Sequence, residues 1–197
     1  MKKIVTILGA RPQFIKAGSV SREIARHKNI EEMIVHTGQH YDANMSDIFF
    51  DQMKILKPNY FLGIGGKSHG AMTGQMIEKI EEILIQEQPD WVIVYGDTNS
   101  TLAGALAASK LHIKIAHVEA GLRSYNMRMP EEVNRIITDR LSSLLFCPTK
   151  IAIENLENEA INIWGHDVKA FLSGDVMQDG ALFYRDFLNV WAECGDF

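Results

Sequence analysis

The chain has 197 residues, of which 46% are hydrophobic and 23% are charged, a composition typical of a globular domain with one core. Its net charge of −5 and its lack of a basic stripe argue against nucleic acid as a partner. No apolar run is long enough for membrane insertion, and two cysteines outside any CxxC pair indicate a reduced, cytoplasmic protein.

Short β-rich apolar runs alternate with amphipathic helical patterns along the chain. Strands are predicted at residues 3–8, 32–36, 60–64, 91–95, 114–118, 144–147 and 168–172. Helices are predicted at residues 13–27, 44–53, 72–88, 101–111, 130–142, 150–159 and 177–191. This alternation predicts an α/β fold with a Rossmann-like parallel sheet and helices on both faces. The predicted domain covers residues 1–175, and a helical tail follows at residues 176–197.

The loop at residues 9–16 follows the first strand and opens a helix, with Pro12 near its first turn. Arg11 and Lys16 lie at this helix start, although the helix dipole disfavours a cation there by ~0.3–1 kcal/mol. The two residues indicate a site for an anionic ligand, phosphate or carboxylate, held together with backbone N–H groups. A solvated surface charge explains Lys16 equally well, whereas the ligand is the favoured explanation for Arg11.

Asp97 and Glu119 each follow directly on a predicted strand, and Glu131 lies in the first turn of a later helix. Ligands of parallel sheets bind beyond the carboxyl ends of the strands, and converging carboxylates suit proton transfer. Each residue also has a structural explanation. Asp97 could cap a helix, Glu119 could pair with Arg123, and Glu131 suits the helix dipole. The convergence of these loops with the basic first loop favours a functional site.

The chain lacks the patterns of the common cofactor and hydrolase sites. Neither a GxGxxG fingerprint nor a Walker P-loop occurs, so no nicotinamide or ATP cofactor is expected. His36, His40 and Asp42 do not have a recognised zinc spacing, and no metal site is predicted. No GxSxG elbow supports a serine hydrolase.

Taken together and in order, the motifs resemble the N-terminal half of the non-hydrolysing UDP-N-acetylglucosamine 2-epimerases. The resemblance covers nearly the whole chain, from Lys3 to about Leu182. Any one motif is weak, but many in the right order are highly specific. The matching segments are residues 9–16, 37–40, 96–101, 117–123, 130–135, 147–149 and 174–176.

The resemblance implies one half of a GT-B-type fold, in which two Rossmann-like domains hold a UDP-sugar between them. It implies an isomerase that inverts carbon 2 of UDP-N-acetylglucosamine, or of a related UDP-HexNAc sugar, without a cofactor. UDP is eliminated to leave a glycal, and is then added back. Asp97, Glu119 and Glu131 match the acidic catalytic residues of the family, without a choice between them for the base. The candidates for substrate binding are Arg11, Lys16, Gln39, His40, Arg123 and Arg135.

The resemblance also implies a cytoplasmic homodimer that pairs through this half and serves envelope or capsule polysaccharide synthesis. The family chains are roughly twice as long, and the absent half would supply a catalytic histidine and a segment that grips UDP. The chain alone is therefore expected to form an incomplete, inactive cleft. Gln13, Phe14 and Tyr41 depart from the commonest family residues, and these changes resemble relatives that act on a UDP-diacetamido uronic acid. The alternatives are a hydrolysing relative and a non-catalytic dimerisation or ligand-binding domain.

Overall fold

Parallel strands form one sheet in the order β3-β2-β1-β4-β5-β6-β7. The computed structural model describes residues 1–39, 50, 55–165 and 167–193. Within these residues the strands are β1 Lys2–Leu8, β2 Ile30–His36, β3 Tyr60–Phe61, β4 Trp91–Tyr95, β5 Lys114–Val118, β6 Leu144–Cys147 and β7 Lys169–Leu172. The strand order reverses between β1 and β4, which makes this the point where a doubly wound sheet opens a crevice for ligands.

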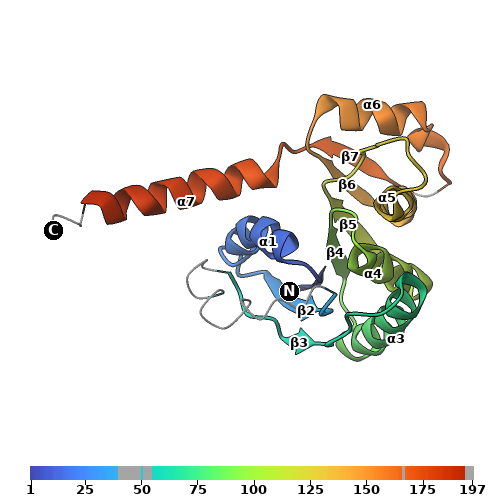
Figure 1. Cartoon of the computed structure of the whole chain (residues 1–197), viewed down its shortest axis with the longest axis horizontal. Helices are drawn as coiled ribbons and strands as arrows, with labels where there is room; N and C mark the ends of the chain where they lie inside the picture. Colours follow the sequence, from blue (N-terminus) through green and yellow to red (C-terminus); the bar gives the residue numbers. More distant parts are fainter. Residues whose placement is uncertain (40–49, 51–54, 166, 194–197) are drawn as a thin grey trace.

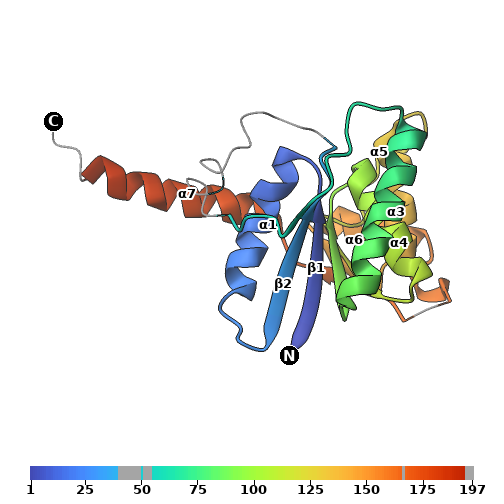
Figure 2. The same cartoon turned by 90° about the horizontal axis from the view of Figure 1, so that it is seen from below.

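Helices cover both faces of the sheet, as Figure 2 shows, with α1 on one face and α3, α4 and α5 on the other. Right-handed crossovers explain this division, because the connection from β1 to β2 runs across the sheet in the opposite direction to the connections from β3 onward. The described helices are α1 Arg11–Ile24, α3 His69–Glu87, α4 Asn99–Lys110, α5 Pro130–Leu141, α6 Lys150–Asn158 and α7 Val176–Glu193, with a 3₁₀ turn at Ile161–Ile163.

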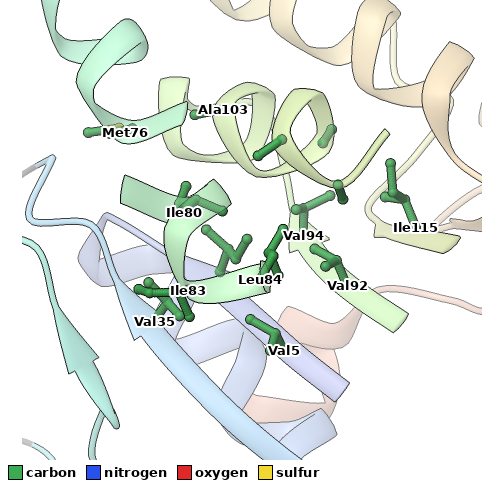
Figure 3. Packing of buried hydrophobic residues seen from close by; sticks show 14 of the residues in the cluster. Val5, Val35, Met76, Ile80, Ile83, Leu84, Val92, Val94, Ala103 and Ile115 are labelled. Atoms are coloured by element: carbon green, nitrogen blue, oxygen red, sulfur yellow. The ribbon is translucent and has the colours of Figure 1, made fainter. Parts of the chain in front are cut away.

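One hydrophobic cluster lies between the sheet and the helices α3 and α4 (Figure 3). Small residues let α4 approach closely: a Cβ atom added to Gly104 would lie 2.9 Å from Ile7 Cδ1 and 3.1 Å from Val94 Cγ1. On the opposite face, Phe14 and Ala17 of α1 are fully buried in a second cluster. These two clusters fix the sheet and hold the carboxyl ends of β1, β4 and β5 together.

The face of the sheet that carries α1 has an open groove beside that helix. The groove has a volume of about 540 Å³ and is lined mainly by apolar side chains from β4, β5 and β6, together with residues of α1 and the start of α7. Helix α7 contacts α1, where the Arg22 guanidinium lies 3.8 Å from the Phe183 ring centroid, and then extends away from the sheet (Figure 1).

The Rossmann-like parallel sheet confirms the predicted fold class, with small differences at element ends. The predicted strand at residues 60–64 pairs as a strand only over Tyr60–Phe61, where it lies at the edge of the sheet. Helix α4 starts at Asn99, two residues early, because Thr98 caps it. The predicted helix at residues 44–53 lies outside the described residues except for residue 50. Among the described helices, none combines the length and the apolar character needed to cross a bilayer.

Candidate active site

Asp97 lies just beyond β4, in the turn that leads into α4. Gly96 has a φ of +63°, and Thr98 rather than Asp97 caps the helix, since the Thr98 side chain accepts a hydrogen bond from Thr101 N at 3.3 Å. The Asp97 carboxylate is therefore available and forms an ion pair with Arg135 of α5. One third of the Asp97 side chain (34%) remains exposed, so it can meet a ligand.

Glu119 follows β5 in a backbone conformation that is rare for a residue with a side chain, with φ at +72°. Such residues cost about 1–3 kcal/mol and cluster at functional sites. Its carboxylate forms an ion pair with Lys16 of α1, and the two side chains are 25% and 16% exposed. A Cβ atom at Gly96 would lie 3.1 Å from Glu119 Oε2, so the turn that carries Asp97 passes directly beside this ion pair.

Gln13 joins the first loop to the loop after β4. Its side chain is 3% exposed, and its Oε1 accepts hydrogen bonds from the backbone N–H groups of Gly9 and Ala10 at 2.8 and 3.1 Å. Its Nε2 donates to the Tyr95 carbonyl oxygen at 2.7 Å and to the hydroxyl groups of Thr98 and Thr101. This amide spans the switch point between β1 and β4 and fixes the relative position of the two loops.

The start of α5 presents two adjacent carboxylates with different surroundings. Glu131 is exposed, whereas Glu132 is 1% exposed and accepts hydrogen bonds from the backbone N–H groups of Ser124 and Tyr125. Burial alone would raise the pKa of Glu132, but those N–H groups and the Arg135 charge lower it below its usual value. Glu132 therefore orders the loop before α5, and Glu131 faces outward.

Arg123 lies in a buried network rather than beside Glu119, so the pairing of Glu119 with Arg123 considered from the sequence does not occur. The Arg123 side chain is 1% exposed, and its guanidinium binds the carboxylates of Asp139 at 2.7 Å and Glu159 at 2.6 and 3.0 Å. These bonds engage all three guanidinium nitrogens within the chain. The arrangement makes Arg123 a residue that holds the loop after β5.

Two further predicted site residues, Arg11 and Gln39, lie at the same edge of the sheet. Arg11 is exposed at the first turn of α1. Gln39 Oε1 accepts hydrogen bonds from the backbone N–H group of Ser100 at 2.8 Å and from its hydroxyl group at 2.7 Å, which ties the loop after β2 to the start of α4. His40 lies outside the described residues.

Asn134 is a site residue that was not singled out from the sequence. It is 5% exposed, and its side-chain amide donates to the Asp97 carbonyl oxygen at 2.9 Å and to Asn99 Oδ1 at 3.2 Å. It lies one residue before Arg135, so α5 holds both the backbone and the carboxylate of Asp97. The sequence signal was a polar side chain on the buried side of a helix.

The assembled edge combines groups that can take up a proton with groups that attract negative charge. Two carboxylates, Asp97 and Glu119, lie at the ends of neighbouring parallel strands, and each faces one cation. A partly exposed carboxylate held in this way is suited to act as a general base. Arg11 and the N-terminus of α1 offer positive charge and N–H donors for an anion next to them.

Comparison with known proteins identifies the same architecture in longer chains. The family model described as UDP-N-acetylglucosamine 2-epimerase matches residues 22–193. A UDP-2,3-diacetamido-2,3-dideoxy-D-glucuronate 2-epimerase of Pseudomonas aeruginosa is 62% identical, covering 92% of this chain and 51% of the relative. A UDP-N-acetylglucosamine 2-epimerase homologue of Methanococcus maripaludis is also 62% identical, and the match covers 91% of this chain and 48% of that relative.

A crystal structure of the Methanocaldococcus jannaschii UDP-GlcNAc 2-epimerase in complex with UDP-GlcNAc and UDP superimposes with a TM-score of 0.85. It is 48% identical, and the match covers 93% of this chain and 49% of the other. The chain thus spans about half the length of each of these relatives, which agrees with one half of a GT-B-type fold. Because the family match extends from α1 to the end of α7, through the strand ends that carry Asp97 and Glu119, the chain belongs to the UDP-N-acetylglucosamine 2-epimerase family.

Proposed function

We propose that this chain is the N-terminal domain of a UDP-HexNAc 2-epimerase, and that it carries the acidic residues of the reaction. The observation that supports this most directly is the position of Asp97 and Glu119 beyond neighbouring strands, beside the switch point of the sheet. One of these carboxylates would remove the proton from carbon 2 of the sugar while UDP departs. The other carboxylate would return a proton to the opposite face of carbon 2 when UDP adds back.

The departing UDP is an anion, so the reaction also needs positive charge near the diphosphate. Arg11 at the start of α1 is the candidate for this role, supported by its exposure and by the helix dipole. Lys16 and Arg135 already pair with the carboxylates, and in the proposed site they fix the positions of these groups. Gln39 and His40 complete the proposed substrate-binding set, and Glu131 stays a candidate acid at the outer side of α5.

The sugar is proposed to be a UDP-linked 2-acetamido sugar, either UDP-GlcNAc or the diacetamido uronic acid. The chain is 62% identical both to the Pseudomonas relative and to the first Methanococcus relative, so sequence identity does not favour one sugar over the other. We further propose that residues 1–175 form the domain, that α7 leads toward a second, UDP-binding domain, and that the protein acts in the cytoplasm. Cys147, a free and buried thiol, is consistent with a reducing compartment.

The test is exchange of the carbon 2 proton in heavy water, followed by NMR with each of the two sugars. The chain alone would be compared with a chimera that joins residues 1–175 to the second half of the Pseudomonas relative. We expect exchange in the chimera and little or none in the chain alone. A folded chimera that binds UDP but exchanges neither sugar would contradict the proposal. Free sugar as the main product would instead identify a hydrolysing enzyme.

Asp97→Asn in the chimera should abolish exchange because it removes the proposed base or its partner while keeping the side-chain shape. The matched control is Glu82→Gln on α3, since Glu82 is also a carboxylate in an ion pair, with Lys79 at 2.7 Å, but it is exposed on another surface. Exchange retained by the Asp97→Asn chimera would remove Asp97 from the reaction.

Pairing of two copies through this half is a proposal that stands on the family resemblance. Sedimentation of the chain at micromolar concentration tests it directly. A strict monomer would contradict the proposal, and a dimer with no exchange activity in the chimera would favour a non-catalytic dimerisation domain.

A further inference from the structure

His117 is a fully buried side chain of β5 with a hydrogen-bond partner on each ring nitrogen. Its exposed fraction is 0%, its Nδ1 lies 2.6 Å from Asp139 Oδ1, and its Nε2 lies 2.7 Å from the carbonyl oxygen of Gly96. Gly96 is the residue directly before Asp97, in the turn beside the Glu119–Lys16 ion pair. The ring therefore connects α5 to the turn that carries a proposed catalytic carboxylate.

The two partners determine where the hydrogens of the ring must be. A carbonyl oxygen has no hydrogen to donate, so the bond to Gly96 requires a hydrogen on His117 Nε2. An ionised carboxylate is likewise an acceptor only, so the bond to Asp139 requires a hydrogen on Nδ1. A neutral imidazole has a hydrogen on one nitrogen only. The two contacts together therefore need the doubly protonated, positively charged ring.

The other contacts of Asp139 favour its ionised form over a neutral acid that would share the proton. Its second oxygen, Oδ2, accepts from Arg123 at 2.7 Å and from the backbone N–H group of Gly121 at 3.1 Å. Burial raises the pKa of Asp139, and independently of His117 the charge and hydrogen bond of Arg123 at Oδ2 lower it. Oδ2 thus faces two donors, which favours the carboxylate over the neutral acid.

The surrounding charges balance, as a buried network requires. Two cations, His117 and Arg123, face two carboxylates, Asp139 and Glu159. Cys147 of the neighbouring strand β6 also lies near Asp139. Burial and the Asp139 charge raise the pKa of its thiol to about 12, so the thiol is neutral. The end of β4 contributes the Gly96 carbonyl group. With Asp139 ionised, these charges balance when the ring of His117 is positively charged.

We propose that His117, held as a charged imidazolium by its two acceptors, is a positioning residue for the two proposed catalytic loops. Through His117, one oxygen of Asp139 holds the Gly96 carbonyl group, and with it the turn that carries Asp97. Through the Gly121 N–H group, the other oxygen holds the loop that carries Glu119. A single buried carboxylate thus sets the separation of the two proposed catalytic residues, whichever sugar the enzyme uses.

The first test is nitrogen-15 NMR of the histidine rings in the 197-residue chain at pH 7.5. His117 should show two protonated ring nitrogens, and the exposed His27 serves as the solvent-facing comparison. His27→Gln assigns the comparison signal. A His117 ring that is neutral at pH 7.5, in either tautomer, would overturn the proposal. The measurement needs no substrate, so it is independent of whether the chain serves an epimerase.

The second test neutralises the central carboxylate with Asp139→Asn, which keeps its shape. An amide group can donate to Nδ1, so His117 should become neutral with its hydrogen on Nε2 only, still bonded to Gly96. The Gly121 N–H group should keep its slow hydrogen exchange, because the amide oxygen of the new side chain takes the place of Oδ2. A ring that stays doubly protonated in the folded variant would refute the role of Asp139.

Discussion

Gln13 provides a direct test of how the site loops are held together, because one buried amide serves two of them. In Gln13→Leu the side chain keeps a similar volume but can no longer accept or donate hydrogen bonds. The backbone N–H groups of Gly9 and Ala10 then lose their shared acceptor. The Tyr95 carbonyl oxygen does not become unpaired, because it also accepts from the Thr101 hydroxyl group at 2.7 Å.

The size of the effect follows from the two N–H groups that lose their partner. A buried polar group left without a partner costs about 1–3 kcal/mol, so we expect the free energy of unfolding to fall by about 2–5 kcal/mol. The total free energy of unfolding of domains of this kind is about 5–15 kcal/mol. The loss would therefore be a large part of the stability and easy to measure.

Urea unfolding followed by circular dichroism measures the change in the free energy of unfolding. The comparison requires that this free energy falls with urea concentration at the same slope in both proteins. Gln13→Glu is the matched control, because its carboxylate still accepts from both N–H groups. It should cost less than the leucine variant, although it loses the donor toward Tyr95. A leucine variant within about 0.5 kcal/mol of the parent would refute the reasoning.

Three further predictions concern the same part of the fold. Gly121→Ala should lower the free energy of unfolding by about 2–4 kcal/mol, because φ is +75° and the new Cβ would lie 2.4 Å from the Ala152 carbonyl oxygen; an unchanged melting temperature would contradict this. Burial lowers the pKa of His36 to about 4, so the unfolded chain binds more protons between about pH 4 and 6.5. The contribution of His36 to the free energy of unfolding is therefore complete above pH 6.5, and about 3 kcal/mol of it should be lost as the pH drops to 4. His36→Asn keeps an acceptor for Gly38 N and should remove this part of the pH dependence, as measured by urea unfolding. Burial raises the pKa of Cys147 to about 12, so peptide mapping should find it alkylated only after unfolding.

The sequence predicts the sheet well because its strands are short, apolar and buried on both sides, with helices of clear period between them. The predicted element ends are wrong where a single local contact determines where a strand or helix begins or stops. The strand at residues 60–64 runs at the edge and pairs with one neighbour only, so two of its residues qualify as strand. The start of α4 depends on which of four good capping residues is used, and only the structure selects Thr98.

The site is predictable in part, because strand ends are visible in the sequence and their partners are not. The position of Asp97 and Glu119 follows from the end of each apolar run. Which cation meets Glu119 depends on how α1 lies across the sheet, and this favours Lys16 over the nearer residue in sequence, Arg123. The buried bond between His117 and Asp139 is equally invisible, since 22 residues separate them.

Helical geometry explains why the sequence could not distinguish the two adjacent carboxylates of α5. Successive residues of a helix point about 100° apart, so two adjacent side chains can have different surroundings. Arg135, which meets Asp97, lies three residues after Glu132 and on the same side, and the two side chains pair at 3.3 Å. Glu131 is thereby turned outward, so a catalytic role for it requires a ligand held beyond the strand ends. Asp97 and Glu119 already lie at those ends, which makes them the first carboxylates to test.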